Sequence, residues 1–307
     1  MAVTKAIEKI VENYTSDNPG TKTNLVRLLA SGRLGGTGKL IILPVDQGFE
    51  HGPDRSFAVN PNAYDPRYHI ELAIEAGLSA YAAPLGMLEV VASDYAGTIP
   101  LILKLNSANL LSNKILAPHQ AITGSVHDAL RLGCVAVGVT IYPGSDMCND
   151  MIEMAREIIA EAKSVGLVAV VWSYPRGSGI PKGMESAVDI VSYAAHIAAL
   201  IGAHIIKVKV PSKNISSQEM LGIYNECKIK FANCEDRIAH IMRTTFNGKR
   251  IVVFSGGNAK DTHLLHEEIK AIHKGGGSGS IIGRNVFRRE RKEALNMLGE
   301  IVDIYSK

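Results

Sequence analysis

Eight short runs of apolar, mostly β-branched residues recur between residue 39 and the C-terminus, and they constrain the fold more than any other feature of the chain. Each run is followed by a loop and a stretch with helical, amphipathic periodicity. The runs are apolar on both faces and do not alternate, which is typical of parallel strands covered by helices. The predicted strands are 40–46, 79–84, 100–106, 134–142, 167–174, 203–210, 250–256 and 279–284.

Eight β-then-α units within residues 39–307 predict an α/β fold, a single (β/α)8 TIM barrel, for which about 250 residues is typical. A doubly wound open sheet is the alternative, but its first β–α turn would carry a glycine fingerprint that is missing here. The stretch "GGGSGSIIG" (275–283) has the fingerprint spacing but precedes a strand, so we interpret it as the end of a helix.

Capping signals mark the ends of the predicted helices. The segments "SVHD" (125–128) and "DMIE" (150–153) both match the pattern of a helix start. Four glycines lie just before predicted strands, where a helix C-terminus favours a left-handed residue: 77, 133, 166 and 202.

Residues 1–38 lie outside the repeat and are predicted to form an N-terminal helical extension, with 39–307 as the catalytic barrel domain. The stretch "NLVRLLASGRLGGTGK" (24–39) is typical of a helix followed by a glycine turn. We expect the extension either to close the floor of the barrel or to serve an interface.

Composition excludes several classes of protein. The chain has 33 Lys plus Arg and 30 Asp plus Glu, a balance too even for a nucleic-acid partner. The start "MAVTKAIEKIVENY" lacks the apolar core of a signal peptide, and no apolar run reaches the ~20 residues of a membrane span. The four cysteines show no C-x-x-C spacing, which speaks against a zinc site or a disulfide framework. We predict a cytoplasmic protein.

Polar residues gather at the C-terminal ends of the predicted strands, where the chemistry of a barrel lies. In contrast, the N-terminal halves of the strands are almost purely apolar. The strand-end residues are Asp46, Lys104, Asn106, Tyr142, Trp172, Tyr174, Lys207, Lys209, Ser255, Gly256, Gly257, Gly283 and Arg284.

Two lysines in the sixth predicted strand indicate a reactive amine. Lys207 and Lys209 are two residues apart, so they share one face of the strand. If that face lines the lumen, burial and a nearby cation lower the pKa of the deeper ammonium, and a neutral amine can form a Schiff base with a carbonyl. Alternatively, both lysines extend past the helices or pair with buried carboxylates.

The loops after the last two strands, "SGG" (255–257) and "GRN" (283–285), predict a phosphate site, because glycine backbone N–H groups and an arginine fork suit that anion. The segment "DQGFEHG" (46–52) offers Asp46, Glu50 and His51 as metal ligands. We nevertheless expect no metal, since no second histidine cluster lies at a strand end.

Seven motifs resemble those of the class I fructose-bisphosphate aldolases of the archaeal and bacterial type, in sequence and in order along the chain. The resemblance covers nearly the whole chain, and residues 16–40 are similar to the longer, bacterial-type members. The motifs are "ILPVDQGFEHGP" (42–53), "LILKLN" (101–106), "TIYPGS" (140–145), "VVWSYPRG" (170–177), "IIKVK" (205–209), "FSGG" (254–257) and "IIGRN" (281–285).

The resemblance implies reversible cleavage of fructose 1,6-bisphosphate by a homo-oligomer without a cofactor. It assigns the imine to Lys207, acid/base chemistry to Tyr174, the hydroxyl proton to Asp46 and substrate orientation to Trp172. Gln47 departs from the compact archaeal members, which have histidine there. The predicted substrate-binding residues are Gln47, His51, Lys104, Arg176, Lys209, Ser255, Gly256, Gly257, Gly283 and Arg284.

Three other functions fit the same motifs. Relatives of this family use the same lysine to act on other phosphorylated carbonyl substrates. They include a transaldol-type synthase and a thiolase. A phosphate-binding regulator without activity is the alternative from a different class, although intact Asp46, Tyr174 and Lys207 speak against it.

Overall fold

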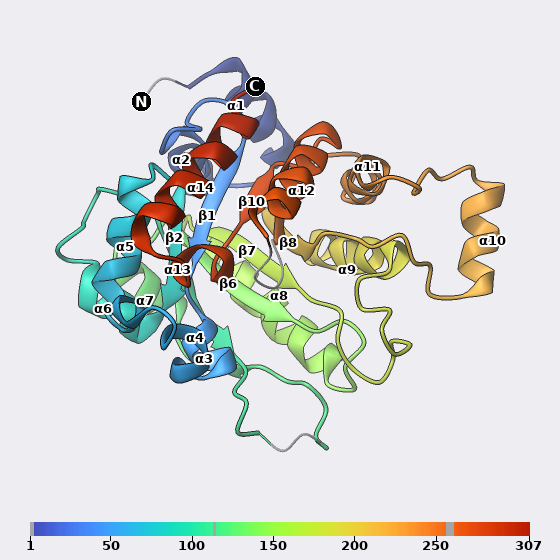
Figure 1. The fold of residues 1–307 in the computed structure, drawn as a ribbon, viewed down its shortest axis with the longest axis horizontal. Coiled ribbons are helices and arrows are strands. Elements are labelled where there is room, and N and C mark those ends of the chain that lie inside the picture. The colour runs from blue at the N-terminus through green and yellow to red at the C-terminus, as the bar shows by residue number, and fades with distance from the viewer. Residues whose placement is uncertain (1–2, 113–114, 256–260) are drawn as a thin grey trace.

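The computed structural model describes residues 3–112, 115–255 and 261–307. Eight parallel strands close into a barrel with helices around it (Figure 1), which confirms the predicted (β/α)8 architecture. Around the barrel the order is β1-β10-β9-β8-β7-β6-β3-β2. The barrel strands are β1 (Leu40–Pro44), β2 (Ala80–Pro84), β3 (Leu101–Lys104), β6 (Ala136–Ile141), β7 (Val168–Ser173), β8 (Ile205–Lys209), β9 (Ile251–Ser255) and β10 (Gly279–Ile281).

Helices cover the outer faces of the strands, and a small antiparallel pair, β4 (Asn106–Ser107) with β5 (Ala121–Ile122), follows β3. No helix in the described ranges is long and apolar enough to cross a membrane. The helices are α1 (Lys5–Val11), η1 (Glu12–Tyr14), α2 (Pro19–Ala30), α3 (Gln47–His51), α4 (Pro53–Phe57), η2 (Pro61–Tyr64), α5 (Pro66–Glu75), α6 (Leu85–Val91), α7 (Val126–Arg131), α8 (Cys148–Ser164), α9 (Val188–Leu200), α10 (Gln218–Glu226), α11 (Cys234–Thr244), α12 (Thr262–Lys274), α13 (Arg284–Phe287) and α14 (Arg291–Tyr305).

Most of the predicted helix ends are confirmed. The four glycines that precede strands have φ values of +65°, +67°, +84° and +95°, which side chains disfavour. Ser125 and Asp128 form the predicted capping box at the start of α7. The predicted start at Asp150 is wrong, because α8 begins at Cys148 without a side-chain cap. Two successive hydrogen-bonded turns, Tyr142 to Ser145 and Ser145 to Cys148, lead directly into the helix. Asp150 therefore lies inside the first turn of α8.

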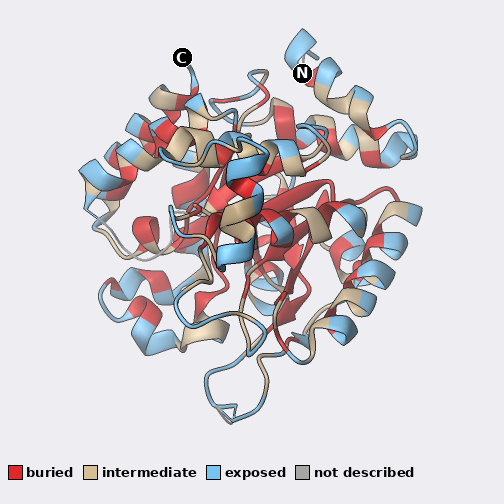
Figure 2. Ribbon diagram, turned by 90° about the vertical axis from the view of Figure 1, so that its right-hand side faces the viewer, coloured by how far each residue is buried: buried red, intermediate tan, exposed pale blue. Residues whose placement is uncertain are grey.

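The strands divide the apolar core into two clusters. Figure 2 shows the buried residues in red. Outward side chains such as Ile41 and Leu43 pack under the helices. Inward side chains such as Ile42, Val170 and Val253 fill the lumen, and the same cluster includes residues of α1, η1 and α2: Ile7, Tyr14, Leu25, Leu28 and Leu29. The N-terminal helices therefore close the floor of the barrel. The division of the chain at residue 38 stays a prediction.

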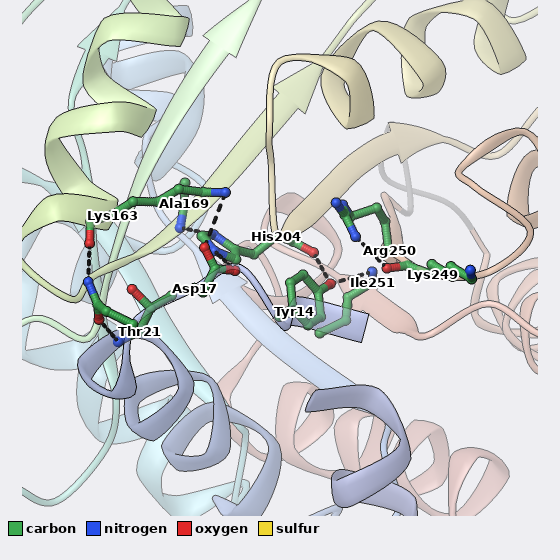
Figure 3. Close-up of polar contacts among 10 residues, drawn as sticks. Tyr14, Asp17, Thr21, Lys163, Ala169, His204, Lys249, Arg250 and Ile251 are labelled. Carbon is green, nitrogen blue, oxygen red and sulfur yellow. Dashed lines mark hydrogen bonds and ion pairs between the residues drawn. The ribbon is translucent and has the colours of Figure 1, made fainter. Parts of the chain in front are cut away.

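Polar contacts attach the extension to the floor (Figure 3). The Tyr14 hydroxyl donates to the His204 carbonyl at 2.7 Å and accepts from the Ile251 amide at 3.2 Å. His204 Nδ1 accepts from the Ala169 amide, so its proton is on Nε2, which donates to Asp17 at 3.0 Å. Burial raises the pKa of Asp17, but His204 and a nearby lysine outweigh it and hold that pKa below its usual value.

Candidate active site

Strand β8 presents Lys207 to the lumen, level with Trp172 on β7 and Val253 on β9. Its ammonium lies 5.5 Å from the ring centroids of both Trp172 and Tyr174, and the residue is 5% exposed. It forms no hydrogen bond or ion pair with the described part of the chain, so neither alternative interpretation of the strand lysines holds for Lys207.

The pKa of Lys207 is lowered from 10.5 to about 8. Burial is the main cause, because it penalises the charged form. The carboxylates of Asp46 and Glu50 raise this pKa, whereas the charges of Lys104 and Arg284 lower it further. Lys207 therefore has a neutral, nucleophilic form within reach of physiological pH.

A second buried lysine lies near the same indole. The Lys104 ammonium is 5.6 Å from the Trp172 ring, and the residue is 1% exposed. It donates to the Asn106 carbonyl and, at 3.0 Å, to Asn106 Oδ1. The Asn106 amide is held in turn by the backbone of Thr140 at 2.7 and 2.9 Å. Lys104 is thus held by Asn106 near Trp172, and its predicted role in substrate binding stays a prediction.

Gly138 on β6 makes room for this arrangement, and sequence reasoning missed it. A Cβ at Gly138 would lie 2.1 Å from Cζ3 of Trp172, a distance that no real side chain tolerates. The absence of a side chain lets the indole pack directly against the backbone of β6. A lone glycine within an apolar strand was the only available signal.

A pocket opens above Lys207 at the C-terminal rim of the barrel, and most of the predicted site residues line it. Gly256 and Gly257 fall outside the described residues. The predicted residues in its lining are Asp46, Gln47, His51, Tyr174, Arg176, Lys207, Lys209, Ser255, Gly283 and Arg284. Residues that were not predicted as part of the site are Pro44, Glu50, Ile281, Ile282 and Asn285.

Two carboxylates share this pocket. Glu50 follows Asp46 by four residues along the short helix α3, a spacing that places both on one helical face. Burial and the charge of Asp46 raise the pKa of Glu50, while nearby cations oppose the shift. The sequence suggested Glu50 only as a metal ligand. Within the described residues, no three His, Cys, Asp or Glu side chains are placed to hold a metal ion.

Tyr174 lines the pocket near Lys207. Burial, followed by the charges of Asp46 and Glu50, raises its pKa well above 10, so the phenol keeps its proton at neutral pH. The Arg176 guanidinium lies 5.9 Å from the Tyr174 ring and 4.8 Å from the Tyr142 ring, and it donates to the Tyr142 hydroxyl at 3.1 Å. Tyr142 therefore fixes Arg176 at the mouth.

The mouth is rich in positive charge. Burial lowers the pKa of His51, and the charges of Arg284 and Arg176 add to the effect. The pKa of Lys209 is lowered by burial and by Arg176. Several cations around one opening attract anions and oppose protonation of the neighbouring basic groups. This geometry therefore favours a multiply charged anionic ligand.

Glycine is required where β10 ends. A Cβ at Gly283 would lie 2.6 Å from the Pro44 carbonyl oxygen and 3.2 Å from Gln47 Nε2. This close approach places the start of α13, with Arg284, against the end of β1 and beside Ser255 of β9. The position agrees with the phosphate site that many barrels form after their last two strands.

Known aldolases are similar to this chain over most of its length. The family model for DeoC/LacD family aldolases matches residues 40–289. A probable fructose-bisphosphate aldolase class 1 from Chlamydia trachomatis is 38% identical over 294 residues, which is 92% of this chain and 83% of that protein. The fructose-bisphosphate aldolase class 1 of Thermoproteus tenax is 35% identical over 267 residues, covering 86% of this chain and 90% of the relative.

A solved structure provides the link to the chemistry. An archaeal fructose-1,6-bisphosphate aldolase, whose catalytic lysine is bound covalently to the carbinolamine intermediate of its substrate, superposes with a TM-score of 0.76. It is 32% identical and covers 92% of this chain and 99% of its own. The fold, the buried lysine and these matches agree, and the chain belongs to the DeoC/LacD aldolase family.

Proposed function

We propose that this protein is a class I fructose-1,6-bisphosphate aldolase, which cleaves its substrate reversibly to dihydroxyacetone phosphate and glyceraldehyde 3-phosphate. The observation that carries the proposal is the unpaired Lys207 amine, buried in the lumen with a pKa of about 8. The family and the relatives named for this activity support it.

The reaction starts with the neutral form of Lys207. With a pKa of about 8, about a tenth of the molecules carry this form at pH 7. The amine adds to the C2 ketone, and loss of water gives a protonated imine. Cleavage of the C3–C4 bond leaves its electron pair on C3, where the imine accepts it as an enamine. Protonation at C3 and hydrolysis then release dihydroxyacetone phosphate and restore the amine.

Two neighbouring groups move the protons. Tyr174 is protonated at neutral pH, so it donates to the hydroxyl that leaves the carbinolamine. The positive charge of the imine stabilises the phenolate that remains by lowering the pKa of this phenol, and the phenolate takes up a proton again as the imine is hydrolysed. Asp46, in the same pocket, accepts the C4 hydroxyl proton as the carbon–carbon bond breaks.

The two phosphates of the substrate lie at opposite ends of the pocket in this proposal. Ser255, Gly283 and Arg284 hold the phosphate on the ketone side, and the cations at the mouth, Arg176 and Lys209, bind the other. We infer that Gln47 and His51 contact the chain between them, since both line the same wall.

A transaldol-type synthase is the second candidate. A Methanocaldococcus jannaschii relative that is 27% identical is named fructose-bisphosphate aldolase/6-deoxy-5-ketofructose 1-phosphate synthase. Cleavage of fructose 1,6-bisphosphate in a coupled dehydrogenase assay, with and without EDTA, tests the main proposal. We expect turnover that survives EDTA and disappears in Lys207→Met. No turnover with this sugar, but turnover with another phosphorylated ketose, would favour the synthase.

The proposal includes a cytoplasmic, homo-oligomeric enzyme. Nothing in the charge balance of the chain suits a nucleic acid, and its relatives in this family are named as enzymes of sugar phosphates.

A further inference from the structure

The pocket contains one carboxylate that the proposed reaction does not use. Two carboxylates are part of its lining, and Asp46 already accepts the C4 hydroxyl proton, which leaves Glu50 without a role. The side chain of Glu50 forms no hydrogen bond and no ion pair with residues 3–112, 115–255 or 261–307. A desolvated carboxylate without a hydrogen-bond donor costs free energy, so we expect a ligand to supply the donor.

Helix α3 holds Glu50 toward the pocket. The helix begins shortly after β1, and the Gln47 carbonyl accepts from the Ser56 hydroxyl of α4 at 2.9 Å. On the side facing α4, a Cβ at Gly48 would lie 3.0 Å from Cε2 of Phe57, so the backbone of α3 packs directly on that ring. Glu50 is two residues further on, about 200° around the helix, which turns it away from α4 and into the pocket.

The carboxyl group of Glu50 decides which part of a sugar phosphate it can meet. A carboxylate repels phosphate, and the cations of the pocket, Arg176, Lys209 and Arg284, already serve that group. Burial and the charge of Asp46 raise the pKa of Glu50, but in either protonation state a carboxyl oxygen accepts a hydrogen bond. A hydroxyl group carries a donor and no charge, so it suits this side chain. We therefore expect Glu50 to meet a hydroxylated carbon of the substrate.

The neighbours of Glu50 select one hydroxyl of the sugar. The charges of Lys104, Arg176 and Lys207 all act on this carboxylate, and Arg176 acts more strongly than Lys207. In the proposed function Lys207 holds C2 and Arg176 holds the phosphate on C6, so Glu50 lies beside the chain between them and nearer to C6. The C4 hydroxyl belongs to Asp46, which is one helical turn away on the same face. The C5 hydroxyl is the next along the chain toward C6.

We propose that Glu50 accepts a hydrogen bond from the C5 hydroxyl of fructose 1,6-bisphosphate and thereby selects substrates that carry a hydroxyl at this carbon. This inference rests on the proposed function, and it adds a residue by which the pocket recognises the aldehyde half of the substrate. Glyceraldehyde 3-phosphate keeps this hydroxyl after cleavage, on its own C2, whereas dihydroxyacetone phosphate contains no part of C4–C6. Glu50 therefore acts on the cleavage of the complete sugar and not on the reaction of Lys207 with dihydroxyacetone phosphate.

The cleavage of 5-deoxyfructose 1,6-bisphosphate, compared with that of fructose 1,6-bisphosphate, tests the proposal. Both sugars release dihydroxyacetone phosphate, so one coupled dehydrogenase assay measures kcat/KM for each. We expect the wild type to favour fructose 1,6-bisphosphate by about 10–100-fold, the usual effect of a hydrogen bond to a charged group, and Glu50→Ala to favour it by less than about threefold. Glu50→Gln, whose amide oxygen still accepts a hydrogen bond, should give an intermediate preference. A wild type without this preference, or Glu50→Ala with the wild-type preference, overturns the proposal.

Two controls separate this role from others. Lys209→Met weakens the binding of a phosphate that both sugars carry, so it should lower both kcat/KM values and keep their ratio. Borohydride trapping with dihydroxyacetone phosphate should label Glu50→Ala as fully as the wild type, because the removal of a carboxylate that raises the pKa of Lys207 does not slow imine formation. An unlabelled Glu50→Ala would mean that Glu50 organises the whole site, which overturns a specific role at C5. A wild type that cleaves neither sugar would contradict the proposed function and this inference with it, whereas an unchanged ratio in an active Glu50→Ala overturns this inference alone.

Discussion

At the scale of the residue, the burial that makes the Lys207 amine reactive also destabilises the folded chain. The lowering of its pKa from 10.5 to about 8 means that the buried ammonium costs the folded chain about 3 kcal/mol. This cost is complete below pH 8, where the lysine is charged in both states. It disappears as the pH rises toward 10.5, because the folded chain loses its proton first.

Lys207→Met should therefore raise the free energy of unfolding at pH 7 by up to about 3 kcal/mol, and much less at pH 10. Urea unfolding at both pH values measures the difference. Lys209→Met is the matched control, since Lys209 is only half-buried and should give a smaller gain. Equal effects of Lys207→Met at the two pH values would contradict the lowered pKa.

The sequence drew attention to Lys209 as the neighbouring cation, but in the structure the charge of Lys104, near the same Trp172 ring, lowers the pKa of Lys207. Removing its charge in Lys104→Met should raise the pKa of Lys207 and slow imine formation about threefold at pH 7 while sparing the rate at pH 9. The pH profile of turnover measures this shift, and Lys104→Arg should retain the wild-type profile. A loss of activity that is uniform across pH would indicate a merely structural role.

Tyr174→Phe removes the proton donor but keeps the ring beside Lys207. We expect sugar phosphate binding to persist and turnover to fall by about 10²–10⁴-fold, the usual contribution of a positioned acid/base. Steady-state kinetics together with calorimetric binding separate the two effects. A wild-type rate would remove Tyr174 from the mechanism.

At the scale of the element, a glycine on β6 leaves room for a large side chain on the neighbouring strand β7. Gly138→Ala would place a methyl group 2.1 Å from Cζ3 at the edge of the Trp172 ring. We expect a loss of about 1–3 kcal/mol in stability, the usual effect of overpacking, with reduced activity because the indole moves from Lys207. Thermal unfolding and tryptophan fluorescence measure both effects, since Trp172 is the single tryptophan of the chain.

Gly86→Ala in α6 is the control for this substitution, because nothing lies within 4 Å of the added methyl group. It should be neutral or stabilise by up to about 1 kcal/mol, since alanine favours helix. If Gly138→Ala behaved like Gly86→Ala, the packing of Trp172 against β6 would be wrong.

At the scale of the whole molecule, the barrel could be predicted from the sequence because strand and helix periodicities differ so clearly. The run 134–142, for example, becomes β6 at Ala136–Ile141. Residues at strand ends could be predicted to meet, since parallel strands bring their carboxyl ends to one rim. Glu50 and Gly138 were missed, because their roles depend on the turn after β1 and on the shape of the lumen. That α10 projects from the barrel could not be predicted, because no periodic signal shows where a helix projects.

The central claim is that Lys207 forms the imine with the substrate ketone. Borohydride reduction in the presence of dihydroxyacetone phosphate tests this claim most directly. Peptide mass spectrometry should find a stable adduct on the peptide that carries Lys207. The adduct should persist in Lys209→Met and vanish in Lys207→Met. An adduct at another lysine, or none with an active wild-type enzyme, would contradict the account.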